Sequence, residues 1–171
     1  MQYEIAPLSK ATQIFIMVLF VLVPVGLVSM TVITVNDQQL TWKVAWPVAV
    51  IMFLIGLACL RRGVALEGET LQIKAAMYTH QVNIREINLE QAKVLDLQEQ
   101  PAARPKWRTN GYSLPGGFNA GYYRGQQKQK MFCLVTASKV LRLPMLNGDE
   151  ILLSLEQPQI LLDRLHHITR S

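Results

Sequence analysis

Residues 11–36 read ATQIFIMVLFVLVPVGLVSMTVITVN, 26 consecutive positions without Asp, Glu, Lys or Arg. A helix rises about 1.5 Å per residue, so this stretch makes a helix of about 39 Å, longer than the roughly 30 Å hydrocarbon core of a bilayer. The apolar region of a secretory signal peptide usually has only about 7 to 15 residues. The stretch therefore predicts a first membrane-spanning helix at residues 11–35.

A second uncharged stretch covers residues 44–60, which is 17 positions. As a helix it is about 26 Å long, which is short but sufficient to cross a bilayer. The alternative is a helix buried in the core of a soluble protein. With the first stretch it predicts a transmembrane hairpin, joined by a short extracytoplasmic loop at residues 36–43.

Basic residues near the helix ends predict the orientation of this hairpin. Arg61 and Arg62 adjoin the end of the second helix, whereas the loop between the helices carries Lys43 as its single basic residue. Lys and Arg are in excess in cytoplasmic loops. The N-terminus at residues 1–10 and the domain at residues 63–171 are therefore predicted to be cytoplasmic.

From Gly63 onward the apolar residues fall into strand-length runs broken by turn residues. The runs on either side of Gly68 predict a hairpin, and Asn147-Gly148 predicts a second hairpin with a type I′ turn. We expect strands at residues 64–67, 71–75, 78–84, 92–97, 122–124, 131–136, 140–144 and 150–153.

The stretch at residues 98–121 lacks this pattern and is rich in Pro, Gly, Asn and Arg. A segment of this length without secondary structure is usually a functional or flexible loop. We therefore expect a long loop here, in the middle of the β-rich domain.

The chain ends in a predicted helix. Ser154 is a candidate cap, Pro158 suits a first turn, and Leu161, Leu165 and Ile168 form one apolar stripe. A terminal helix with one stripe is readily buried against the open face of a sheet. The predicted fold is a two-helix transmembrane hairpin followed by a mainly-β domain, an antiparallel, partly open barrel with a C-terminal α-helix.

Several segments resemble a bacterial pleckstrin-homology-like (PH-like) family: Arg108 to Gly111, Gly116 to Arg124, Val135-Thr136 and Leu152 to Pro158. Tyr123 stands where the family pattern has Phe. The resemblance implies a PH-like fold and a multi-pass protein of the bacterial inner (plasma) membrane, but no ligand. The turn positions expected to determine the fold are Gly111, Gly117, Gly121, Asn147 and Gly148.

Positive charge is concentrated in the second half of the domain. From Pro101 to Gly148 there is no Asp or Glu, yet there are eight basic residues: Arg104, Lys106, Arg108, Arg124, Lys128, Lys130, Lys139 and Arg142. Under an anionic leaflet each basic residue that reaches the surface gains about 1 kcal/mol. Two interpretations stay open, a surface that binds anionic lipid headgroups or a protein partner, and solvated charges that keep a small domain soluble.

The motif Arg108-Thr109-Asn110-Gly111 also has two interpretations. Its guanidinium, hydroxyl and amide groups can together hold an anion. Alternatively, Thr and Asn bond to local backbone and the Asn-Gly pair forms a tight turn. The candidate binding residues are Arg104, Lys106, Arg108, Thr109, Asn110 and Arg124.

Catalytic and cofactor sites are not predicted. His166 and His167 are adjacent, so they cannot face one metal as an i, i+4 pair would, and no phosphate loop or nucleophile elbow is present. The basic stretch lacks an RNA-binding aromatic motif or a DNA-recognition helix, so no nucleic-acid partner is expected.

An inositol-phosphate ligand is also disfavoured. The loop after the first strand, where lipid-binding PH domains concentrate basic residues, reads Glu67-Gly68-Glu69-Thr70, and its two carboxylates repel phosphate. The sequence thus predicts a non-catalytic, membrane-tethered interaction module without a cofactor. The alternatives are a structural or assembly subunit of a membrane protein complex that acts through its transmembrane helices, and an enzyme of unrecognised type. Oligomerisation is compatible with each of these.

Overall fold

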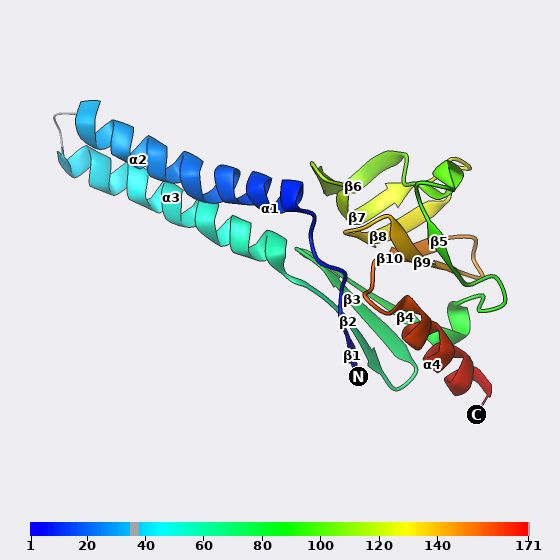
Figure 1. The fold of residues 1–171 in the computed structure, drawn as a ribbon. Coiled ribbons are helices and arrows are strands. Elements are labelled where there is room, and N and C mark those ends of the chain that lie inside the picture. The colour runs from blue at the N-terminus through cyan, green and yellow to red at the C-terminus, as the bar shows by residue number, and fades with distance from the viewer. Residues whose placement is uncertain (35–37, 171) are drawn as a thin grey trace.

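The computed structural model describes residues 1–34 and 38–170 and shows a long helical hairpin beside a β-rich domain (Figure 1). The predicted loop at residues 36–43 begins outside the described residues. The first rod of the hairpin consists of α1 (Lys10–Met17), η1 (Val18–Leu22) and α2 (Val23–Thr34). The second rod is α3 (Gln38–Leu60), which packs along α2.

The hairpin is apolar on its outer surface. One helix among the described residues, Lys10–Ile33, is long and apolar enough to cross a membrane, and the apolar part of α3, Lys43–Ala58, is shorter. Leu27 in the first rod is 54% exposed and Leu54 in the second is 56% exposed. Large exposed apolar surfaces are typical of contact with lipid or with another protein. The structure thus shows one apolar helix of membrane-spanning length where two were predicted.

Two residues explain the local shape of the hairpin. Pro24 has no N–H, and its ring crowds the carbonyl of Phe20 four residues earlier, which accounts for the π-helical η1 immediately before it. Gly56 allows α3 to approach the first rod, because a Cβ at that position would lie 2.8 Å from the Cβ of Phe20.

The segment before α1 belongs to the β-rich domain. Its strand β1 (Gln2–Tyr3) pairs with β2 (Arg62–Glu67), which follows α3 directly. The backbone N–H of Ala6 donates to Ser154 O at 3.1 Å, and its carbonyl accepts from the Thr136 hydroxyl at 2.7 Å. Both ends of the helical hairpin are therefore fixed to one folded body.

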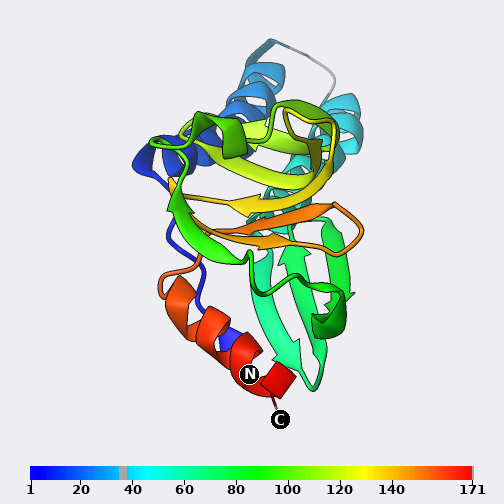
Figure 2. The ribbon, with the colours of Figure 1, turned by 90° about the vertical axis from the view of Figure 1, so that its right-hand side faces the viewer.

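The domain contains two open sheets (Figure 2). The first has the order β1-β2-β3-β4 and adds β3 (Thr70–Ala75) and β4 (Tyr78–Asn83). The second has the order β5-β9-β10-β8-β7-β6. Its strands are β5 (Lys93–Asp96), β6 (Trp107–Leu114), β7 (Phe118–Arg124), β8 (Lys130–Val135), β9 (Lys139–Pro144) and β10 (Glu150–Leu153).

The expectation of a purely antiparallel arrangement is wrong at one position, because β10 is parallel to β8. β10 lies between β8 and β9, although these two are separated by three residues in the chain. Ser154, predicted as a helix cap, instead stabilises the insertion of β10 between β8 and β9. Its buried hydroxyl accepts from the N–H groups of Thr136 at 3.1 Å and Ala137 at 3.2 Å.

The main core lies between the two sheets and is covered by α4 (Pro158–Arg170). The predicted stripe of this helix is confirmed, since Leu161 and Leu165 are fully buried and Ile168 packs against the core. Two short 3₁₀ turns, η2 (Ile84–Glu86) and η3 (Pro101–Ala103), flank the segment that contains β5. A smaller core on the other face of the second sheet includes Leu97, Tyr123 and Met131.

The stretch at residues 98–121 is mostly ordered structure, contrary to the predicted long loop. It contains η3, the whole of β6 and the start of β7. Five of the eight residues of β6 are exposed, so the strand lacks the alternation of buried and exposed residues that sequence patterns detect. Gly111 and Gly121, expected in turns, lie opposite each other within the β6–β7 pair, and Gly117 lies in the loop that joins the strands.

The Asn147-Gly148 hairpin is confirmed, but its turn is not type I′. Gly148 has a φ of +87°, whereas Asn147 is not among the residues with positive φ. Gly148 N donates to Met145 O at 3.0 Å, and Asp149 N donates to the Asn147 side chain at 2.8 Å. The side-chain bond holds Asn147 at negative φ, so Gly148 alone needs the left-handed region. The loop is therefore longer than the two-residue loop of a type I′ turn.

The β6–β7 loop contacts the first turn of α1. Ser9 caps this helix by accepting from Thr12 N at 3.2 Å, and the Thr12 hydroxyl donates to Pro115 O at 2.7 Å. Gly116 has a φ of +90°, and a Cβ there would collide with the hydroxyls of Ser9 and Thr12. The glycine thus allows the second sheet to pack directly against the start of the membrane-length helix.

Candidate interaction surface

The β6–β7 hairpin brings three of the predicted binding residues to the same end of the second sheet. Trp107 lies opposite Arg124, and Arg124 lies opposite Lys130 on β8, so the three side chains form one row across three strands. Arg108 follows Trp107 and pairs with Tyr123, so it lies at the same end but on the opposite face, and Lys106 N donates to Arg124 O at 2.9 Å. Lys106, Arg108 and Arg124 therefore lie at one end of the sheet, although 15 residues separate Arg108 from Arg124 in the chain.

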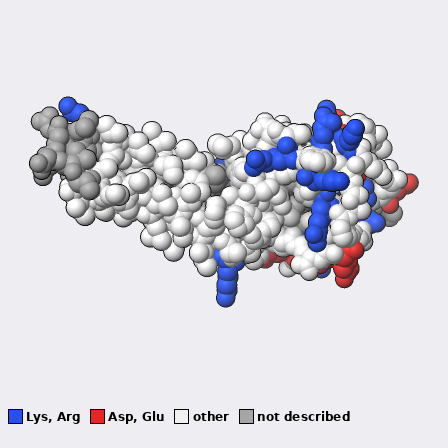
Figure 3. Space-filling model, turned by 90° about the horizontal axis from the view of Figure 1, so that it is seen from above, with Lys and Arg blue, Asp and Glu red and all other residues white. Residues whose placement is uncertain are grey.

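We call this group the basic end, defined as Lys106, Arg108, Arg124, Lys128 and Lys130. All five residues are exposed. Within the part of the chain that the structure describes, the two salt bridges are Arg85–Glu69 and Arg142–Glu150, and neither includes a residue of the basic end. Figure 3 looks down on this side of the domain and shows Lys and Arg gathered there, with Asp and Glu at the margins. The surface is thus strongly cationic and its charges are not neutralised by ion pairs.

An exposed aromatic ring lies within this group of cations. Trp107 is 61% exposed, and the Lys106 ammonium lies 5.7 Å from the centroid of its ring. This distance is within the range of a cation–π interaction, which holds the indole beside the charge. Trp and Arg are the residues most enriched among the energetic centres of protein interfaces. The row therefore combines an apolar anchor with cations.

Three other basic residues of this segment do not belong to the basic end. The Arg104 guanidinium donates to Leu97 O at 2.6 Å. Arg142 forms its salt bridge with the nearly buried Glu150, and this hydrogen-bonded carboxylate raises the pKa of the Arg142 guanidinium. Lys139 lies opposite Asp96 on the neighbouring strand. These contacts make Arg104 and Arg142 structural.

The contacts of Thr109 and Asn110 favour the structural interpretation of the Arg-Thr-Asn-Gly motif. The strand pairing shifts register between Arg108 and Asn110, which makes Thr109 the extra residue of a β-bulge. The Thr109 hydroxyl donates to Tyr122 O at 3.0 Å, and the Asn110 side chain accepts from the Tyr78 hydroxyl at 2.8 Å. Both side chains thus hold β6 in place, and neither points to an anion site.

The basic end adjoins an aromatic cluster that joins the two sheets. His80 on β4 stacks on Phe132 at 4.7 Å between ring centroids and meets Tyr122 edge-on at 5.9 Å. Burial lowers the pKa of His80, and the carboxylates of Asp149 and Glu86 offset part of this shift. The imidazole therefore adds packing to the cluster and no positive charge at neutral pH.

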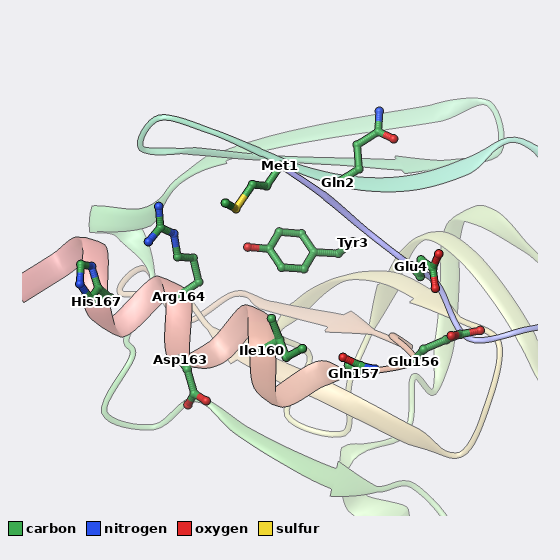
Figure 4. A pocket seen from close by; sticks show the side chains of 10 residues that line it. All are labelled: Met1, Gln2, Tyr3, Glu4, Glu156, Gln157, Ile160, Asp163, Arg164 and His167. Carbon is green, nitrogen blue, oxygen red and sulfur yellow. The ribbon is translucent and has the colours of Figure 1, made fainter.

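A cavity of about 770 Å³ between the N-terminal segment and α4 is a second candidate site (Figure 4). The Tyr3 ring lies in it between the N-terminal segment and α4, and its hydroxyl has no hydrogen-bond partner among the described residues. Burial raises the pKa of this phenol, and Arg164 offsets part of the shift. The walls carry both acidic and basic side chains, which gives no argument for one ligand: Glu4, Glu156, Asp163 and Arg164.

Sequence reasoning omitted Trp107 and Lys130 from the candidate binding residues. The missing information was the pairing of β6 with β7, because the row across three strands forms when Trp107 lies opposite Arg124.

Comparison with protein-family models, with curated proteins and with solved structures finds no match for this chain.

Proposed function

We propose that this chain is a non-catalytic, membrane-tethered interaction module with a PH-like domain, and that its basic end binds an acidic surface of a protein partner. The row of Trp107, Arg124 and Lys130 is the observation that carries the proposal. Two open sheets with a C-terminal helix are compatible with a PH-like fold, although the parallel β8–β10 pair departs from the expected antiparallel arrangement.

The proposed anchor is a hairpin of two transmembrane helices. Residues 1–6 hydrogen-bond to strands that follow the hairpin, so the chain leaves the domain and returns to it. If the first rod crosses the membrane, α3 must cross back, because otherwise the two ends of the domain would lie on opposite sides. The 23 residues of α3 span about 34 Å, which is long enough.

The proposed location of the domain is the cytoplasmic side of a bacterial inner membrane. Arg61 and Arg62 directly follow α3 and support this orientation. We expect Gln2→Cys and Gln126→Cys to resist an impermeant maleimide in intact cells and to react after permeabilisation, while Gln39→Cys reacts in both. If one of positions 2 and 126 reacts in intact cells and the other reacts only after permeabilisation, the two ends lie on opposite sides of the membrane and the hairpin is excluded.

A protein partner is favoured over the lipid surface by the direction in which the basic end faces. In Figure 3 the helical rods lie in the plane of the picture and the cationic face is turned toward the viewer. The face is therefore directed perpendicular to the rods and not along them toward the membrane. Electrostatic attraction to a leaflet decays within about a Debye length of 10 Å. A second membrane-attached protein lies within reach of such a face, and shared confinement raises its effective concentration.

The binding test uses the full chain in nanodiscs of neutral phosphatidylcholine, with polyglutamate as the acidic probe. We expect salt-sensitive binding, and we expect Arg124→Glu with Lys130→Glu to weaken it about tenfold or more, because charge reversal at a rim replaces attraction by repulsion. Lys93→Glu with Arg164→Glu reverses the same amount of charge at two exposed residues, on β5 at the opposite edge of the sheet and on α4, and is the matched control that should have little effect.

The outcomes of this experiment separate the possibilities. Equal losses for the double variant and the Lys93→Glu/Arg164→Glu control would show that binding depends on net charge and would overturn the proposed site. Flotation of the nanodiscs with phosphatidylglycerol vesicles, without polyglutamate binding, would assign the surface to lipid. No binding of either probe would remove the basic end as an interaction site.

A further inference from the structure

The strand that carries the basic end is an open edge. β6 is last in the order of the second sheet and pairs with β7 on one side. In an antiparallel pair, alternate residues direct their N–H and C=O groups away from the partner strand, so an edge strand presents unpaired groups. With eight residues β6 is the longest strand in the described chain, and five of these residues are exposed.

The other strands that end a sheet are poorer docking edges. β1 has two residues and β5 has four. β4 has six residues, two fewer than β6, and none of them is Lys or Arg, so it offers no attraction to an acidic segment. Strand addition needs a long accessible edge, which among the described strands β6 provides.

The charge around β6 selects the kind of strand that can pair with it. Proteins protect edges with charged residues and bulges, and β6 has both, with Lys106, Arg108 and Arg124 beside the bulge at Thr109. These cations repel β6 of a second copy, which would bring the same charges into contact. An acidic segment meets no such repulsion and gains attraction instead.

We propose that β6 is the docking edge for an extended acidic segment of a partner protein, which adds to the second sheet as a further strand. This inference rests on the proposed function and specifies the partner and the mode of binding. Backbone hydrogen bonds hold the segment along β6. Its acidic side chains alternate with apolar ones, so they share one face and lie on the side of the row, toward Arg124 and Lys130.

The bulge fixes where the segment can pair. The register of β6 changes between Arg108 and Asn110, and the bonds of Thr109 and Asn110 hold this geometry. Toward its other end, β6 leads into the loop that contacts α1. The accessible part therefore runs from the basic end along the strand, which suits a segment of about six residues, or roughly 20 Å.

A pair of modified peptides tests the inference. The probe is Glu-Val-Glu-Trp-Glu-Val-Glu, measured against the full chain in neutral nanodiscs, alongside two versions that carry N-methyl groups on either the odd or the even amides. In strand addition only one of these two sets donates to β6. We expect one methylated version to bind at least tenfold more weakly than the parent, and the other to bind nearly as well.

Hydrogen exchange gives a second readout. Amides of β6 should exchange more slowly when the parent peptide is bound, while those of β5 at the opposite edge should not change. Equal affinity of all three peptides, with the Arg124→Glu/Lys130→Glu loss retained, would overturn strand addition and leave the proposed electrostatic surface intact. Insensitivity of parent binding to those two substitutions would instead overturn the proposed function.

Discussion

Replacement of Gly121 with alanine is expected to lower the free energy of unfolding by about 3 kcal/mol or more. Gly121 has a φ of +107°, a conformation that costs other residues about 1 to 3 kcal/mol. A Cβ would also lie 2.7 Å from both Asn110 O and Gly111 Cα and 3.0 Å from the Tyr78 ring. Since two of these atoms belong to backbone, relief requires β6 to move away from β7.

The loss is measured as a shift of the thermal midpoint, followed by near-ultraviolet circular dichroism in mild detergent. We expect a decrease of roughly 6 to 12 °C for a chain of this size. Two alanine substitutions serve as controls. Gly148 has positive φ but no atom near its hypothetical Cβ, and Gly63 has neither constraint. The midpoints should decrease most for Gly121, less for Gly148 and least for Gly63. Equal shifts would contradict the proposed crowding between β6 and β7.

The second large effect is expected for Ser154→Ala, at about 2 kcal/mol. The Ser154 side chain is fully buried and is the acceptor for Thr136 N and Ala137 N, while it donates to Ala137 O at 3.2 Å. Alanine removes the hydroxyl and leaves the buried Thr136 N–H without a partner. An unsatisfied buried donor costs about 1 to 3 kcal/mol.

Ser113→Ala is the matched control, because Ser113 is exposed and bonds to the Asn119 side chain at 2.6 Å. It also contacts the Tyr123 hydroxyl at 3.0 Å, but that hydroxyl keeps its own bond to Tyr112 O after the substitution. We expect a change within about 0.5 kcal/mol for this variant, which is typical of surface substitutions. Chemical denaturation with urea in the same detergent compares the two. If Ser154→Ala is as stable as Ser113→Ala, water or a backbone shift replaces the lost hydroxyl. The proposal that Ser154 stabilises the insertion of β10 between β8 and β9 would then be wrong.

Much of the architecture could be predicted from local patterns. The apolar run at residues 11–36 predicted the long helix, since its composition excludes contact with water over its whole length. The hairpin around Gly68 was recognisable because β2 and β3 bury alternate residues toward a single core. The stripe of Leu161 and Leu165 predicted a buried face of α4.

The candidate site was predictable only in part. The absence of acidic residues between Pro101 and Gly148 identified the cationic segment. It did not show that Arg104 and Arg142 are bound to Leu97 and Glu150, because those partners are not marked by any local spacing. Nor did it reveal β6, whose exposed residues carry no alternation because the strand lies at an edge.

Properties that depend on neighbouring residues in the chain were therefore accessible from the amino-acid sequence: the long apolar helix, most strands and the apolar face of α4. The insertion of β10 between β8 and β9, the role of Ser154 and the row of Trp107, Arg124 and Lys130 were not. Each of these depends on which strand lies beside which. That choice is made by packing and backbone pairing between distant segments, whose energies are absent from any local pattern.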